Sequence, residues 1–186
     1  MNPSLVGSEM CIRDSFKADN VIDFAWAADP DFVEETFDVD GVTLRLVHQA
    51  SPDLDSNWTA LGDYAARAMA FINEDIGPYM YPEYNVVQGG DGGMEYPMLT
   101  LVTGERSLRS LVGVTVHEMA HSWFQAMVAT NESLHEWMDE GFTSWAESRC
   151  MAELFADPMK PTENPHKWSY GGYINQHLSG LSLIHI

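Results

Sequence analysis

Two histidines four positions apart, with a glutamate between them, form the most informative segment of this sequence. His117, Glu118 and His121 stand in the string His-Glu-Met-Ala-His. Residues four apart lie on one face of an α-helix, so both imidazoles project in the same direction. Two imidazole nitrogens placed in this way can bind one zinc ion at about 2.0–2.1 Å. Glu118 lies beside the pair and is suited to take a proton from a metal-bound water.

A catalytic zinc ion needs a third protein ligand and an open fourth position. Glu140 is our candidate, because the 18 residues between His121 and Glu140 leave room for one helix to end and a second helix to return. We therefore expect one zinc ion per chain, bound by His117, His121 and Glu140. Two alternatives to a catalytic zinc site remain. The histidines could be partly buried without binding a metal, or they could belong to a closed structural zinc site. His135 is the nearest further histidine, and we expect it at the surface or hydrogen-bonded to a ligand.

A glycine-rich segment upstream ends in a carboxylate. A loop with further glycines precedes this segment, and a short strand is expected to begin with Gly92, Gly93, Met94 and Glu95. A glycine pair before an acidic residue on a strand allows the backbone to approach a ligand closely. Glu95 would then present its carboxylate beside a cleft. Taken alone, a tight turn with a solvated glutamate explains the same residues.

The elements that must position these residues follow from hydrophobic periodicity. Val42, Leu44 and Leu46 alternate with polar residues, which indicates a half-buried strand. The segment 16–30 suggests a strand and a turn. Elsewhere the sequence predicts short strands at 84–87 and 97–102, and helices at 55–76, 107–128 and 136–155. Strands first and helices later indicate an α+β fold, with a mixed β-sheet followed by the helices that bear the motifs.

The two ends of the chain are related to each other at the DNA level. A coding string for residues 9–15 has a reverse complement that encodes residues 181–186. An adapter on both sides of a sequenced fragment produces this relation. We therefore interpret 1–15 and 181–186 as sequencing-adapter artefacts and exclude them from the fold. We assign 16–30 to the last strand of a preceding β domain and its junction, and 31–180 to a catalytic domain that is incomplete at its C-terminus.

Composition excludes several classes of function. The formal net charge is −19, from 28 acidic and 9 basic residues, so binding to nucleic acid through a basic face is excluded. No run of 18 or more apolar residues predicts a membrane-spanning segment. Cys150 is expected to be a small buried side chain and not a nucleophile. Asp139 is expected to be a solvated acid at the start of a helix, and a hydrogen bond to a metal-binding histidine is the alternative. No compartment and no oligomeric state are predicted.

Three blocks of the sequence together resemble one family of enzymes. They are GGMEY at 92–96, HEMAH at 117–121 and WMDEGF at 137–142. In this order they resemble the zinc aminopeptidases of the gluzincin clan, which includes aminopeptidase N and leukotriene A4 hydrolase. The resemblance extends over roughly 16–180 and implies a truncated thermolysin-like zincin catalytic domain. It also implies that Glu95 binds the free α-amine of a peptide substrate, with Gly92, Gly93 and Met94 lining the substrate.

The resemblance has two departures and leaves alternatives open. Tyr96 stands where the family usually has asparagine. The family's oxyanion-stabilising tyrosine is expected beyond this chain, so that role is assigned neither to Tyr170 nor to Tyr173, and the fragment is expected to be nearly inactive alone. The expected function is removal of N-terminal residues from peptides with a free N-terminus. The alternatives are a zinc endopeptidase or dual hydrolase on the same scaffold, and a non-catalytic peptide-binding relative.

Overall fold

A computed structural model describes residues 17–52, 55–90 and 92–156 of the chain. Five strands form one mixed sheet in the order β1-β2-β3-β5-β4. Their bounds are Phe32–Val39 (β1), Val42–Gln49 (β2), Glu83–Gly89 (β3), Gly93–Tyr96 (β4) and Leu99–Thr103 (β5). The outer pairs β1/β2 and β4/β5 are antiparallel, whereas β2/β3 and β3/β5 are parallel. The expected α+β architecture is therefore confirmed.

The hairpin at the β1 edge follows from its turn residues. Asp40 and Gly41 connect β1 to β2 with φ values of 54° and 84°. Positive φ at both central residues gives a turn whose twist matches the two strands, and Asp-Gly is a preferred pair for it. Within β2, Leu44 and Leu46 are fully buried, so the alternation expected for this strand is confirmed.

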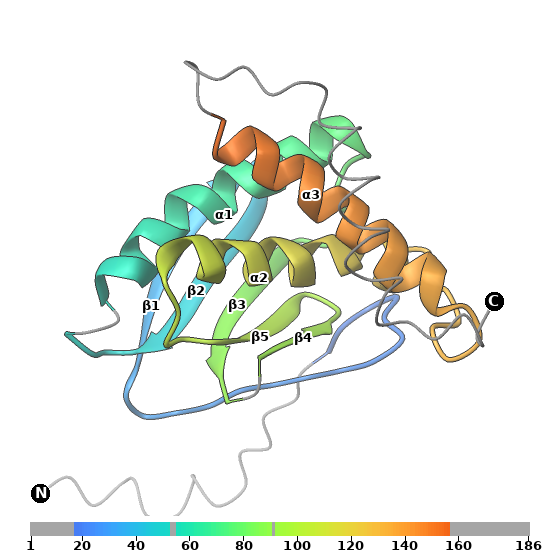
Figure 1. The fold of residues 1–186 in the computed structure, drawn as a ribbon. Coiled ribbons are helices and arrows are strands. Elements are labelled where there is room, and N and C mark those ends of the chain that lie inside the picture. The colour runs from blue at the N-terminus through green and yellow to red at the C-terminus, as the bar shows by residue number, and fades with distance from the viewer. Residues whose placement is uncertain (1–16, 53–54, 91, 157–186) are drawn as a thin grey trace, which may run out of the picture.

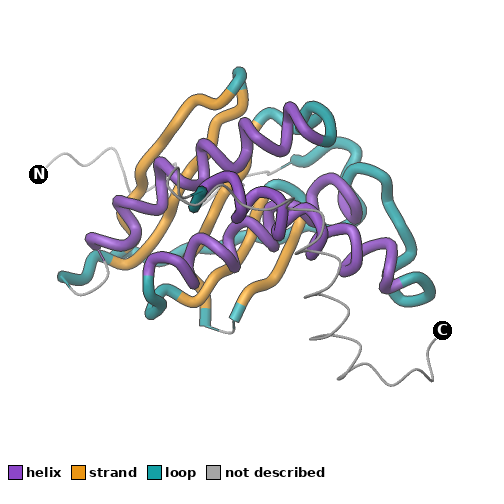
Figure 2. Tube along the Cα trace, turned by 45° about the horizontal axis from the view of Figure 1, so that its top comes forward, coloured by secondary structure: helices purple, strands orange, loops and turns teal. Residues whose placement is uncertain are grey.

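Three helices cover one face of the sheet (Figures 1 and 2). They are α1 (Asp55–Asp75), α2 (Leu108–His121) and α3 (Phe142–Leu154). Helices α1 and α2 pack against the strands, and α3 packs on both of these helices. The core between the layers consists of large side chains with no solvent exposure, including Trp58, Leu61, Met69, Tyr84, Val86, Leu111 and Met119. This core fixes α2 above the β4–β5 end of the sheet.

Both helices that bear the motifs differ in detail from the expected ranges. The helix expected over 107–128 is α-helical to His121 and continues as a π-helical turn over Ser122–Ala126. The helix expected over 136–155 begins with a second π-helical turn, Trp137–Gly141, before α3. The first π-helical turn directly follows His121 and the second contains Glu140, and such turns are frequent at functional sites.

The strand expected within 16–30 is wrong for the residues that the structure describes. Residues 17–31 cross below the sheet in Figure 1 and form no strand. Trp26 is 78% exposed, and Ile22 and Phe24 are each 51% exposed, so this segment contributes little to the core. A strand requires a hydrogen-bonded neighbour, and no residue of 17–31 pairs with a strand of this sheet. Residues 1–15 and 181–186, interpreted as adapter sequence, lie outside the described residues, as does the tail 157–180.

Of the helices in the described ranges, none has both the length and the apolar character that crossing a membrane requires.

Candidate metal centre

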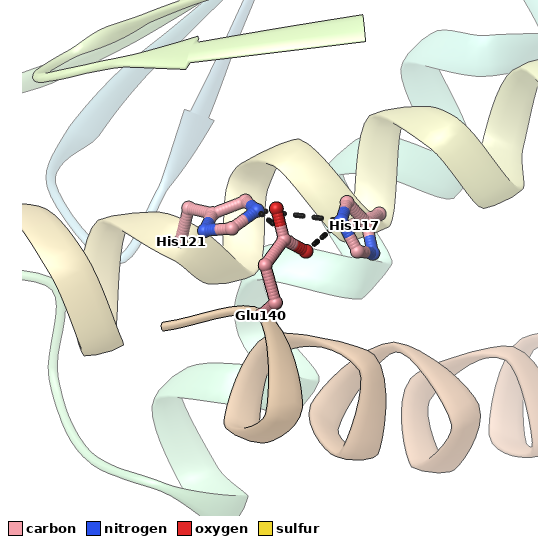
Figure 3. A group of neighbouring side chains, drawn as sticks. All are labelled: His117, His121 and Glu140. Atoms are coloured by element: carbon pink, nitrogen blue, oxygen red, sulfur yellow. Dashed lines mark hydrogen bonds and ion pairs between the residues drawn. The ribbon is translucent and has the colours of Figure 1, made fainter. Parts of the chain in front are cut away.

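The two motif histidines come from consecutive turns of α2 and face the start of α3 (Figure 3). Their Nε2 atoms lie 3.3 Å apart. Glu140, on the π-helical turn before α3, places Oε2 3.3 Å from Nε2 of His117 and 3.8 Å from Nε2 of His121. The structure thus brings together the three residues that the sequence suggested as metal ligands.

The spacing of these three atoms suits a tetrahedral zinc ion. Bonds of about 2.0–2.1 Å in tetrahedral geometry separate neighbouring ligand atoms by roughly 3.3 Å. Two of the three separations have this value, and one ligand atom from each residue lies within 4.8 Å of the others. Two imidazoles and one carboxylate form a donor set typical of catalytic zinc sites. The residues present therefore fit the metal that the motif implies.

The outer nitrogens of both histidines are held by carboxylates. Nδ1 of His121 lies 2.5 Å from Oδ1 of Asp139, and Nδ1 of His117 lies 3.1 Å from Oε2 of Glu147. If each Nδ1 carries the proton, it donates to its carboxylate and leaves the Nε2 lone pair directed at Glu140. Hydrogen bonds of this kind orient metal-binding histidines and raise their basicity.

Asp139 corrects one expectation from the sequence. We expected a solvated acid at a helix start, but its side chain is only 5% exposed and contacts the buried His121. The π-helical turn Trp137–Gly141 places Asp139 and Glu140 on the side that faces α2. Glu147 was not singled out from the sequence, although it follows Glu140 by seven residues and so lies on the same helical face.

The charges at this centre shift the pKa of each group in a direction set by its neighbours. Burial opposes the charged form of His117, but hydrogen bonds to Glu140 and Glu147 outweigh it and raise its pKa to about 10. Burial likewise opposes charge on His121, and the bond to Asp139 leaves its pKa raised. In the metal-free protein both rings therefore favour the protonated, positively charged form.

Glu118 lies beside the histidines and is only 7% exposed. Burial raises its pKa to about 7, although the charges of His117 and His121 oppose that rise. A carboxylate with a pKa near neutrality can both accept and return a proton during a reaction. The environment of Glu118 thus fits a general base.

Strand β4 brings the glycine-rich segment against α2. A Cβ added at Gly93 would lie 2.1 Å from Oε1 of Glu118 and 2.7 Å from Cγ2 of Val114. Only glycine permits this approach, and the close neighbour is Glu118 itself. Two residues on, Oε1 of Glu95 lies 4.0 Å from Nδ1 of His121, with its side chain 15% exposed.

A second acidic group adjoins Glu95 at the His121 end of α2. Carboxylate oxygens of Glu95, Glu132 and Asp139 lie within 4.8 Å of one another. Gln125 donates a hydrogen bond of 3.1 Å to Glu132. Glu132 lies in a connecting segment without a motif of its own, so no sequence pattern pointed to it. Together these acids make this end of the site attractive to a cation.

Two other residues considered from the sequence lie apart from the reaction centre. His135 is exposed, and among the described residues it is not one of those that lie close enough to share a metal ion with His117 and His121. Cys150 is fully buried, and burial raises the pKa of its thiol to about 12. A thiol in this environment is a poor nucleophile, as expected.

Comparison with known proteins identifies the family. Residues 62–170 match the Peptidase family M1 domain, so the chain belongs to this family. This confirms the resemblance to gluzincin aminopeptidases. The chain is 34% identical over 119 residues to leucine aminopeptidase 2 of Ajellomyces capsulatus. This match covers 60% of the chain and 19% of that protein. It is also 40% identical over 90 residues to human aminopeptidase B, in a match that covers 43% of the chain and 13% of that protein.

Solved structures show the same fold. The M1 zinc metallopeptidase from Deinococcus radiodurans superposes with a TM-score of 0.56 at 21% identity. The match covers 79% of this chain and 33% of that one. The chain spans about a fifth of the length of the leucine aminopeptidases that it matches (19%).

Proposed function

We propose that this chain is the zinc-binding part of a metalloaminopeptidase, which removes residues from the N-terminus of peptides. The observation that carries the proposal is the convergence of His117, His121 and Glu140 next to Glu118 and Glu95. Membership of peptidase family M1 and the aminopeptidase names of the relatives support it.

In this proposal His117, His121 and Glu140 hold one zinc ion. Zinc at this position would supply a Lewis acid that polarises the scissile carbonyl and makes an adjacent water more acidic. Asp139 and Glu147 accept hydrogen bonds from the Nδ1 atoms and keep both rings oriented. The negative charges of these two carboxylates would also partly offset the positive charge of a bound zinc ion.

Glu118 is the proposed general base. Burial raises the pKa of this carboxyl group to about 7 in the metal-free protein, and its position beside the histidines lets it take a proton from the attacking water. The same carboxyl group then passes the proton to the leaving amine. Gly93 supports this role, because the absence of its side chain leaves the space that the Glu118 carboxylate occupies.

Glu95 is the proposed binding site for the substrate's α-ammonium group. The neighbouring carboxylates of Glu132 and Asp139 add to the negative potential there. An ammonium group held at Glu95 places the first peptide bond at the metal centre, so residues leave one at a time. Strand β4 forms an edge of the sheet, and we infer that its backbone at Gly92, Gly93 and Met94 lines an extended substrate.

Two other functions use the same scaffold. An endopeptidase or dual hydrolase would bind peptides without a free amine, and the largely buried carboxylate of Glu95 argues against it. A non-catalytic peptide-binding relative would need neither the metal ligands nor the base, whereas His117, His121, Glu140 and Glu118 are all present.

The test uses the protein expressed from its complete gene, with peptides that carry either a free or an acetylated N-terminus. Glu118→Ala should abolish hydrolysis and leave the zinc content unchanged, because it removes a base and no ligand. Glu95→Ala should lower kcat/KM about ten- to a hundredfold for free-amine peptides, since one charge-assisted bond is lost. Acetylated peptides should be poor substrates for both proteins. Equal cleavage of free and acetylated peptides by wild type and Glu95→Ala would overturn the aminopeptidase proposal.

A further inference from the structure

The site has opposite charges at its two ends. Helix α2 and strand β4 run side by side, because Gly93 packs against Val114 while Glu95 lies near His121, one to two turns further on. The His121 end is therefore acidic, since Glu132 and Asp139 join Glu95 there. The chain returns at the Gly93 end through β5, which pairs antiparallel with β4 and leads into α2.

A cleft of about 510 Å³ opens at this second end. It is lined by Arg106, which precedes α2, by Arg109, Ser110 and Gly113 from the start of α2, and by Glu147 from α3. Glu147 also accepts the hydrogen bond from His117. The cleft thus shares one side chain, that of Glu147, with the surroundings of the metal centre.

Neither arginine of the cleft has a carboxylate partner among the described residues. Among the described residues every other lysine or arginine forms an ion pair, namely Lys17, Arg45, Arg67 and Arg149. Arg106 contacts the hydroxyl of Ser110 at 3.3 Å, and its Nε atom is buried with no hydrogen-bond partner in the described part of the chain. Arg109 lies with its guanidinium 4.4 Å from the ring of Phe155. In a chain of net charge −19, two arginines that form no ion pair within the described residues indicate a site for an anion, in a cleft that the Glu147 side chain also lines.

The distance from the metal centre fits a short peptide. Ser110 precedes His117 by seven residues, or two turns on one helical face, which corresponds to roughly 10.5 Å. An extended peptide advances about 3.3 Å per residue. A peptide that runs along α2 towards its start, with its first carbonyl at the metal centre, therefore brings its third following residue to Ser110, which Arg106 contacts.

We propose that Arg106, Arg109 and Ser110 bind a substrate carboxylate about three residues beyond the scissile bond, and that this carboxylate is the free C-terminus of a short peptide. The inference rests on the proposed aminopeptidase function and names its substrate class. The α-ammonium binds at the acidic end and the carboxylate at the arginines, so the site matches the charge distribution of a peptide of about four residues. A guanidinium group suits this role because its planar donors match both carboxylate oxygens.

The test is a binding measurement on the zinc-loaded Glu118→Gln protein expressed from its complete gene. Calorimetry compares three alanine tetrapeptides with free N-termini: the free acid, its C-terminal amide, and an amide whose last residue is glutamate. The acid should bind about tenfold more tightly than the plain amide, the lower range for a charge-assisted bond in an open cleft. Equally tight binding of the glutamate amide would support a carboxylate site in the cleft but overturn the assignment of its ligand to the free C-terminus.

Variants of the arginines identify the residues responsible. Arg106→Gln and Arg109→Gln, singly and together, should bring the acid-to-amide ratio towards one. Arg67→Gln changes the net charge equally on α1, outside the cleft, and should leave the ratio at about tenfold. Circular dichroism checks that each variant is folded. Equal affinity for acid and amide before any arginine is replaced would overturn the inference and leave the aminopeptidase proposal intact. Failure of the protein with Glu118 to cleave any free-amine peptide would overturn that proposal, and the binding ratio would still decide the role of the cleft.

Discussion

Replacing Asp139 tests whether the buried carboxylate behind His121 strengthens metal binding. Removal of a carboxylate that is hydrogen-bonded to a metal-binding histidine typically costs 10- to 100-fold in metal affinity, or roughly 1.4–2.7 kcal/mol. The side chains of Asp139 and His121 are 5% and 1% exposed, so water cannot replace the lost bond. We therefore expect Asp139→Ala near the upper limit, at about a hundredfold. Asp139→Asn keeps the shape and one acceptor and should cost about tenfold.

Glu147 provides the matched comparison on the other histidine. Its side chain is 32% exposed and that of His117 is 22% exposed, so water can partly replace the lost hydrogen bond. Glu147→Gln should therefore weaken zinc binding by less than tenfold. Competition with a chelator of known affinity, at one fixed pH above neutrality, gives all the constants, and circular dichroism checks the fold. If the Asp139 variants bind zinc as tightly as wild type, or more tightly than Glu147→Gln, burial does not set the strength of these bonds and the reasoning is refuted.

Two further predictions concern protons and space at the same centre. Zinc binding should tighten as the pH rises from about 6 to about 9, because the metal requires neutral imidazoles and the metal-free His117, with its pKa raised to about 10, keeps its proton across this range. Calorimetry in buffers of different ionisation heat should count at least about one proton released per zinc, and none released would contradict the electrostatics. Gly93→Ala should lower hydrolysis at least about tenfold with zinc retained, because its Cβ would lie 2.1 Å from Oε1 of Glu118. Gly90→Ala is the control, since nothing lies within 4 Å of its added Cβ, and equal activity of the two variants would contradict the packing.

The parts of the site that the sequence predicted depend on local spacing. His117 and His121 are four residues apart on a strongly periodic helix, so their convergence needs no tertiary information. The return of Glu140 was expected from the 18 intervening residues together with the resemblance to a known family. The helical and strand ranges around these residues were accordingly close to the observed elements.

The missed parts depend on tertiary pairing and on irregular helix geometry. Strand β1 was not expected, although Asp40-Gly41 before the alternating residues of β2 is a hairpin signal that points to it. The environment of Asp139 follows from a π-helical turn, which no residue pattern in this segment specifies. That Arg106 and Arg109 form no ion pair within the described residues depends on tertiary contacts, which the sequence does not specify.

Zinc stoichiometry in the purified protein tests the central claim most directly. Metal analysis should find about one zinc ion per chain in the wild type, bound through His117, His121 and Glu140. The double variant His117→Ala, His121→Ala should lose this zinc, because both imidazole ligands are removed while Glu118 remains. Stoichiometric zinc in the folded double variant would contradict the assignment of the metal centre.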